Sequence, residues 1–172
     1  MTIFETPRLL VRTLRDADFP HIYRMQSDLD TMRYIRAPAT DEQPVRERVA
    51  MWENYRAQCP GLGVFALENK SDGSFVGYVT ARHVDFNPAT GEYEVGYALA
   101  SEWWGQGLAS EIVPPLSQYL FEKSGAAHLV AFTDPDNIAS QRVLLKSGYR
   151  EVGTREIYDG VSKVFRLEKT GA

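Results

Sequence analysis

The sequence has 172 residues, of which 44% are hydrophobic and 24% are charged, proportions typical of a globular chain. It carries 19 Lys and Arg residues against 23 Asp and Glu residues, a net charge of -4, which argues against a nucleic-acid-binding protein because these need a clustered basic face. The single cysteine, Cys59, excludes an intrachain disulfide and a cysteine metal cluster, and the three histidines lack metal-ligand spacing. The N-terminal residues contain no long apolar run, so we expect a cytoplasmic protein with no signal peptide and no membrane span.

The predicted elements alternate between strands and helices along one domain, residues 1–172. Strands are predicted where β-prone runs lie between turn residues, at 9–14, 64–68, 75–82, 92–99, 128–133, 149–156 and 161–168. Helices are predicted where apolar residues recur at helical spacing, at 19–26 after Asp16 or Asp18, from a cap at Thr40 or Asp41 to Pro60, at 108–123 and at 138–147. This order indicates a mixed sheet with helices on its faces, in the α+β or α/β class.

The sequence leaves two local features of the later elements for the structure to decide. Pro114 and Pro115 fall in the middle of the helix predicted at 108–123, so that helix either kinks there or is shorter. The last two strands are predicted to form a hairpin around Asp159-Gly160, because that dipeptide is a common turn former.

The strand at 92–99 has two unlike sides. Period-2 alternation places Tyr93, Val95, Tyr97 and Leu99 on one side, which is bulky and suits a core. The other side carries Glu92, Glu94, Gly96 and Ala98. Small residues in a strand often mark a place where a ligand or another backbone approaches closely.

The stretch WWGQGLASE, residues 103–111, follows that strand and opens a helix. Its glycines allow unusual backbone dihedral angles, and the helix N-terminus presents unpaired N–H groups that favour an anion. The stretch therefore predicts either a plain strand-to-helix turn or a backbone cradle for a pyrophosphate. It is neither a Walker loop nor the G-x-G-x-x-G of dinucleotide folds.

Three motifs, in order along the chain, resemble the GNAT acetyltransferases and, within them, the Rim-type branch of N-acetyltransferases. ETPRLLVRTLRDAD at 5–18 resembles that branch's opening strand and first helix start. YEVGYALASEWWGQGLASE at 93–111 is similar to its strand and acetyl-CoA pyrophosphate loop, and DPDNIASQRVLLKSGYREVG at 134–153 to its asparagine-containing helix. The resemblance implies a GNAT fold, with a mostly antiparallel twisted sheet, a splayed central strand pair and helices on both faces.

The resemblance also implies acetyl-CoA as cosubstrate, with no metal. Its pantetheine arm would lie along Tyr97, Ala98 and Leu99. Asn137 would contact the pantetheine or thioester region, although Asn at this place is also a favoured helix N-cap. The residues that would form the pyrophosphate loop are Trp104, Gly105, Gln106, Gly107, Leu108, Ala109 and Ser110.

The implied reaction moves acetyl from acetyl-CoA to a primary amine by direct attack in a ternary complex. Amines are mostly protonated at neutral pH, so a general base helps, and Glu94 is the candidate. Glu92 lies two positions away, and its like charge is expected to raise the pKa of one of the pair. The alternative is that Glu94 belongs to a solvated strand face or is only a salt-bridge partner.

The proton donor to the leaving thiolate is where this chain departs from much of the superfamily. A Tyr commonly lies seven residues after the motif's Asn, but here that position is Leu144. Ser140 is the nearest hydroxyl and matches the Rim-type pattern, so it is the candidate acid. The alternative is that Ser140 bonds back to its own helix, a common habit of Ser.

The acceptor amine is a protein N-terminus or a small molecule, and the net charge favours a cation. Segments expected to set its specificity are the first two helices with 32–40, the loop 85–91 and the turn 158–160. We expect a monomer or homodimer with no nucleic-acid or membrane partner. Because Leu144 replaces the usual Tyr, a non-catalytic acyl-CoA-binding regulatory module is the alternative function. A phosphate-binding domain unrelated to CoA is a weaker alternative function, since it leaves Asn137 and Gly148-Tyr149 without a role.

Overall fold

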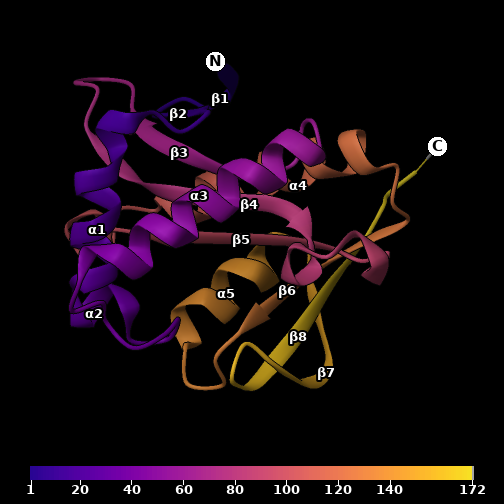
Figure 1. Ribbon diagram of the computed structural model, residues 1–172. Helices are drawn as coiled ribbons and strands as arrows, with labels where there is room; N and C mark the ends of the chain where they lie inside the picture. Colours follow the sequence, from indigo (N-terminus) through magenta and orange to yellow (C-terminus); the bar gives the residue numbers. More distant parts are fainter. Residues whose placement is uncertain (172) are drawn as a thin grey trace. The chain divides into compact units, whose positions relative to one another are not determined.

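The computed structural model describes residues 1–171 (Figure 1). The strands are β1 Thr2–Glu5, β2 Leu9–Arg12, β3 Gly63–Asn69, β4 Phe75–His83, β5 Tyr93–Leu99, β6 His128–Thr133, β7 Arg150–Ile157 and β8 Gly160–Glu168. The α-helices are α1 Phe19–Ser27, α2 Leu29–Met32, α3 Glu42–Gln58, α4 Leu108–Ser124 and α5 Ile138–Lys146. Single 3-10 turns are η1 Asp16–Asp18, η2 Val84–Phe86, η3 Pro88–Thr90 and η4 Ser101–Trp103.

The strands form one mixed sheet, in the order β1-β2-β3-β4-β5-β6-β8-β7. β2 runs antiparallel to β1 and β3, and β8 runs antiparallel to β6 and β7, whereas β5 and β6 are parallel. β6 pairs with β8 along its whole length, but within residues 1–171 its register with β5 joins only Glu94 to Val130. The central parallel pair is therefore splayed, and the predicted fold class is confirmed.

The chain divides into two compact units. The first comprises Met1–Thr80 and Tyr97–Leu108, and the second comprises Ala81–Gly96 together with the chain from Ala109 on. β4 and β5 therefore each contribute residues to both units.

In the first unit, α3 packs against β3 (Figure 1). α3 begins where predicted, because the Asp41 side chain accepts a hydrogen bond from the N–H of Gln43 at 2.9 Å. Its buried face includes Trp52, whose ring centroid lies 5.2 Å from that of Tyr78 on β4. The unit's core consists of buried side chains from strands and helices alike, among them Leu9, Val11, Ile22, Val45, Trp52, Phe65 and Leu67.

In the second unit, α5 packs against β6 and β7. Val84, Val130 and Val164 form a buried cluster against which Phe132 and Ile157 pack. α4 runs unbroken through Pro114 and Pro115, so the interpretation that it is shorter than predicted is wrong. A proline inside a helix costs about 3 kcal/mol or more. Buried apolar side chains on both sides of the prolines offset that cost, and each contributes about 1.5–3 kcal/mol. They are Ile112, Val113, Leu116 and Leu120.

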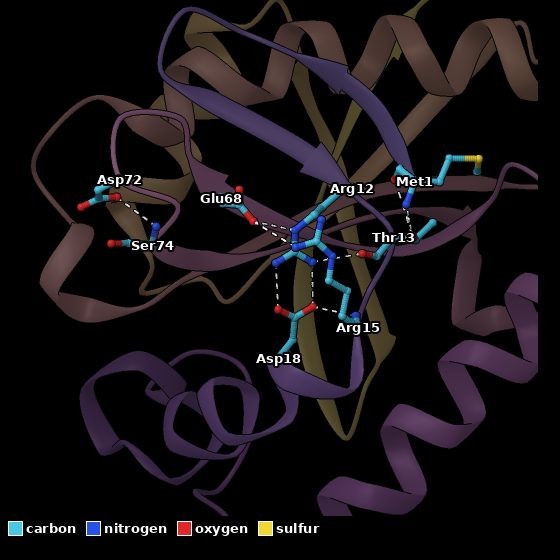
Figure 2. A network of polar contacts seen from close by, with 8 residues as sticks. All are labelled: Met1, Arg12, Thr13, Arg15, Asp18, Glu68, Asp72 and Ser74. Carbon is cyan, nitrogen blue, oxygen red and sulfur yellow. Dashed lines mark hydrogen bonds and ion pairs between the residues drawn. The ribbon is translucent and has the colours of Figure 1, made fainter.

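A buried arginine fixes the N-terminal segment of the first unit (Figure 2). The Arg12 guanidinium, at the end of β2, donates two hydrogen bonds of 2.8 Å to the Asp18 carboxylate and one of 2.7 Å to Glu68 on β3. Asp18 also accepts from the N–H of Arg15 at 2.7 Å. Burial raises the pKa of Asp18, but the hydrogen bonds from Arg12 and Arg15 outweigh it and hold this pKa below its usual 3.8. The pair therefore ties β2, β3 and the start of α1 together.

We predict that Asp18→Asn lowers the free energy of unfolding by about 3 kcal/mol at pH 7, measured by urea denaturation, because it leaves Arg12 incompletely paired. A carboxyl with a lowered pKa contributes stability above its unfolded pKa and loses it as the pH falls through its folded pKa. The difference between the wild type and the variant should therefore shrink below about pH 4.

The matched control is Asp72→Asn. Asp72 is exposed and accepts a hydrogen bond from the N–H of Ser74 at 2.9 Å (Figure 2). Asp72→Asn should lower the free energy of unfolding far less than Asp18→Asn does. Equal stability of the two variants at pH 7 would show that the Arg12 pair does not stabilise the fold.

Candidate functional site

Burial along β5 does not follow the predicted alternation between a core side and an acidic side. Glu94 and Val95 are both buried, as are Ala98 and Leu99, whereas Tyr93 and Tyr97 are half-buried. A central strand covered on both faces need not alternate between polar and apolar residues, which is why the period-2 argument fails here. Glu94 therefore lies inside the protein, at 7% exposure.

The Glu94 carboxylate is held through one oxygen. Arg82 Nη2, on β4, lies 3.2 Å from Oε2, and the Tyr158 hydroxyl donates a hydrogen bond to the same Oε2. Burial raises the pKa of Glu94, and the positive charge of Arg82 and the Tyr158 hydrogen bond offset this only in part. The net effect moves the pKa of this carboxyl upward, in the direction that suits a base working near neutral pH.

Glu92 does not cause that shift, so the expectation that its charge raises the pKa of its neighbour is wrong. Arg155 Nη1 and Nη2 donate to its two oxygens at 2.9 and 3.0 Å, and these hydrogen bonds lower the pKa of Glu92 itself. The guanidinium also neutralises the carboxylate. Burial accounts for the shift at Glu94, and the like charge that adds to it is Asp85.

Two turns with unusual backbone meet beside Glu94. Asp85, Phe86, Tyr158 and Asp159 are the non-glycine residues of the described range 1–171 with positive φ. The Tyr158 hydroxyl accepts from the N–H of Asp85 at 3.0 Å and from Arg82 at 3.2 Å. The Arg82 guanidinium lies 3.9 Å from the centre of the Phe86 ring. The structure thus brings together two of the segments expected to set specificity, 85–91 and 158–160.

The β7–β8 hairpin turn is one residue earlier than predicted. Ile157 pairs with Gly160, so the two loop residues are Tyr158 and Asp159, with φ of 54° and 62°. Two-residue hairpin loops commonly need positive φ at both positions and favour Asn, Asp or Gly there. Sequence reasoning placed Tyr158 in the specificity-setting turn 158–160 but not beside Glu94, and it missed Arg82.

The loop before α4 has left-handed backbone at its two glycines. Gly105 and Gly107 have φ of 73° and 76°, values that side chains rarely allow. A Cβ atom at Gly105 would meet nothing within 4 Å, and at Gly107 only Arg8 Nη2 at 3.6 Å, so backbone conformation rather than crowding requires glycine. The first N–H groups of α4, from Leu108 on, have no acceptor within the helix.

Two side chains anchor this loop within the first unit. Arg8 Nη1 donates to the carbonyl of Gln106 at 2.8 Å, and the indole N–H of Trp104 donates to the carbonyl of Leu99 at 2.9 Å. The loop is thereby attached to β5 at the residues predicted to face a pantetheine arm, 97–99. Arg8 also brings a positive charge to the loop and is a residue that sequence reasoning missed. Its presence in the first motif was the available signal.

Asn137 caps α5, as the alternative interpretation of this residue expects. Its Oδ1 accepts from the N–H of Ser140 at 3.2 Å. Ser140 is half-buried and Leu144, at the place of the superfamily's tyrosine, is buried. The second unit therefore holds Asn137 and Ser140 in contact at the first turn of α5.

Two features are absent from residues 1–171. No group of three or more His, Cys, Asp or Glu side chains in this range could hold a metal ion. None of the helices within it has both the length and the apolar character that crossing a membrane requires.

Comparison with known proteins gives matches over almost the whole chain. A family model described as "Acetyltransferase (GNAT) domain" matches residues 8–150. An uncharacterized N-acetyltransferase of Bacillus subtilis, YoaA, is 26% identical over 162 residues, which covers 91% of this chain and 87% of the relative.

Two solved structures share the fold. The RimL ribosomal L7/L12 alpha-N-protein acetyltransferase in complex with coenzyme A is similar with a TM-score of 0.79 and 15% identity, covering 98% of both chains. The spermidine N-acetyltransferase from Vibrio cholerae, in complex with CoA and spermine, is similar with a TM-score of 0.75 and 17% identity, covering 94% of this chain and 95% of that one. At these identities the likeness concerns the fold, a mixed sheet flanked by helices.

Proposed function

Because the chain belongs to the GNAT acetyltransferases and is thus an acyl-CoA-dependent N-acetyltransferase, we propose that Glu94 deprotonates a primary amine for direct attack on acetyl-CoA in a ternary complex. The proposal treats residues 1–172 as a single GNAT domain. The observation that carries it is the buried Glu94 carboxylate, whose pKa is raised and whose contacts are confined to Oε2.

The two oxygens of Glu94 have different surroundings. Within residues 1–171, Arg82 and Tyr158 contact Oε2, and Oε1 is not among the fully buried polar atoms that lack a partner. We infer that Oε1 is the oxygen that solvent, and hence an amine, can reach. Of the alternatives, a solvated strand face does not fit the burial of Glu94. The salt bridge to Arg82 engages Oε2 and leaves Oε1 to accept a proton.

The loop 105–110 fits a pyrophosphate through the left-handed backbone at its two glycines, the α4 N-terminus and the cation of Arg8. We propose that its N–H groups hold the pyrophosphate of acetyl-CoA and that the pantetheine arm lies along Tyr97, Ala98 and Leu99. Asn137 would contact that arm while it caps α5. When bound, acetyl-CoA supplies the thioester that the amine attacks.

The attack forms the amide bond and breaks the carbon–sulfur bond, so the thiolate leaves and needs a proton. A thiol of pKa about 8.5 is a good leaving group, and a weak donor suffices. We propose that Ser140 provides it, directly or through water. Leu144 cannot.

The acceptor that we propose is a primary amine, of a protein N-terminus or of a small molecule, and the net charge of -4 favours a cationic one. The three sequence motifs and the likeness to RimL support a place in the Rim-type branch. The spermidine enzyme shows that the same fold also serves a small polyamine in another protein. A turnover assay over an amine panel, read by release of free thiol, identifies the acceptor and excludes a non-catalytic acyl-CoA-binding module if any amine reacts.

We predict that Gly107→Val weakens CoA binding at least about tenfold, measured by calorimetry, because φ of 76° is strained for valine and the loop must change to relieve it. The matched control is Gly73→Val, in the β3–β4 turn, where φ is 75°. Both variants carry the same local strain, so only the first should lose affinity. Unchanged CoA affinity in a folded Gly107→Val protein would rule out the cradle.

We predict that Glu94→Gln lowers kcat/KM more than tenfold at neutral pH, since general base catalysis contributes about 10² to 10⁴. CoA affinity should stay the same, and the deficit should narrow at high pH, where the amine is already neutral. Glu92→Gln, on the same strand and paired with Arg155, is the control and should lose far less. Wild-type activity of Glu94→Gln at every pH would assign the base to another group or to a water chain.

We predict that Ser140→Ala lowers kcat by about tenfold or more while acetyl-CoA affinity changes little, because only departure of the thiolate needs the hydroxyl. Ser147→Ala is the matched control, since its hydroxyl donates to the carbonyl of Val143 at 2.8 Å on the same helix. If both variants keep full kcat with a good acceptor, Ser140 belongs to the helix and not to the chemistry.

A further inference from the structure

Tyr158 occupies a backbone position that a tyrosine rarely takes. Its φ is 54° in the two-residue loop between β7 and β8, where Asn, Asp and Gly are the usual residues. The left-handed region is unfavourable for a side chain of this size. Contacts elsewhere must therefore hold it, and a strained residue of this kind often marks a functional site.

The Tyr158 hydroxyl makes three contacts that converge on the base site. It donates to Glu94 Oε2, accepts from the N–H of Asp85 at 3.0 Å and accepts from Arg82 at 3.2 Å. The ring packs edge-on against Phe132, with 5.9 Å between centroids. Asp85, on the other side, is itself strained, with φ of 54°. Both strained turns are thus held by a single hydroxyl group.

We infer that Tyr158 is a positioning residue for the acetyl transfer, which fixes Oε2 of Glu94 so that Oε1 takes the proton of the attacking amine. This inference rests on the proposed function, in which Glu94 is the base. The proton passes from the amine nitrogen to Oε1, and Tyr158 keeps its own. Burial and the Glu94 charge raise the pKa of Tyr158 to about 12, so the phenol remains a donor throughout the working range.

The charged and titratable groups that face Glu94 come from several elements. Arg82 on β4 and Arg155 on β7 lower the pKa of its carboxyl, as does the Tyr158 hydrogen bond, whereas burial and Asp85 on η2 raise it. Removal of the Tyr158 hydroxyl deletes one of the lowering contributions. The pKa of Glu94 then rises further, and the carboxylate form becomes scarcer at any given pH below it.

The test is Tyr158→Phe, which keeps the ring and its packing and removes only the hydroxyl. The pKa of Glu94 is measured directly by carbon NMR of protein labelled at the Glu carboxyl, with the signal assigned by its absence in Glu94→Gln. The acidic limb of kcat/KM is measured in parallel with one amine, which titrates identically in every variant. The matched control is Tyr149→Phe, because Tyr149 is buried and its hydroxyl pairs with Ser117 at 2.8 Å.

We expect Tyr158→Phe to raise the pKa of Glu94 by about half a unit or more and to move the acidic limb by the same amount to higher pH. Tyr149→Phe should move neither. If Tyr158→Phe fails to fold, Tyr158→Phe combined with Asp159→Gly relieves the strain at the second loop position, where φ is 62°, keeps the ring and should give the same shift.

The possible failures are distinguishable. An unchanged NMR pKa and an unchanged limb overturn the role of Tyr158, while the activity of Glu94→Gln still decides the base. An NMR pKa that rises while the limb stays in place overturns the inference in a different way, because Tyr158 then holds a carboxyl that is not the base.

Discussion

Removing the Glu94 carboxyl and the Arg82 guanidinium from water costs several kcal/mol for each ion, and only close pairing with further hydrogen bonds offsets that cost. Their contact of 3.2 Å joins β4 to β5 in the second unit, and the Tyr158 hydroxyl adds the hairpin between β7 and β8. The η2 turn closes the group by donating the N–H of Asp85. Hydrogen bonds and an ion pair centred on the buried Glu94 carboxylate therefore connect β4, β5, η2 and the β7–β8 hairpin.

The first unit contains a buried guanidinium of a different kind. Arg12 uses Nε, Nη1 and Nη2 in hydrogen bonds to two carboxylates and a carbonyl, so its charge is compensated and its donors are satisfied. Arg82 also contacts a carboxylate, but its Nε is buried with no partner among residues 1–171. The incompletely paired Arg82 contacts Tyr158, whose backbone is strained, and strained residues often cluster at functional sites.

Local patterns predicted much of the fold. The bounds of β6 agree with the prediction residue for residue, and α4 differs by one residue at its end, because the turn residues Asp134-Pro135-Asp136 mark the end of β6 and Gly125 marks the end of α4. β1 and α2, with four residues each, are too short to produce a periodic signal. The side-chain alternation of β5 failed because both of its faces are covered, a fact that depends on the whole sheet and not on the strand.

The candidate site was likewise predicted only in part. The glycine loop and Asn137 were found from motifs that are contiguous in sequence. Tyr158 lies 64 residues from Glu94 and Arg8 lies 98 from Gln106, so no local pattern could pair them. Sequence reasoning placed Tyr158 in the specificity-setting turn 158–160 but gave no sign of its contact with Glu94. Contacts between distant residues are what the sequence could not supply.

Trp104 gives the loop a built-in optical reporter. Trp104 is 50% exposed, and its indole N–H donates a hydrogen bond to the Leu99 carbonyl. The ring therefore contacts solvent while its orientation is fixed. Indole emission responds to the polarity and charge of its surroundings. Of the other two tryptophans, Trp52 lies in the core at 5% exposure, whereas Trp103 precedes Trp104 in the chain and is half-buried, so two of the three indoles report on this segment. Intrinsic fluorescence can therefore test, without a label, whether the proposed pyrophosphate binds at the loop.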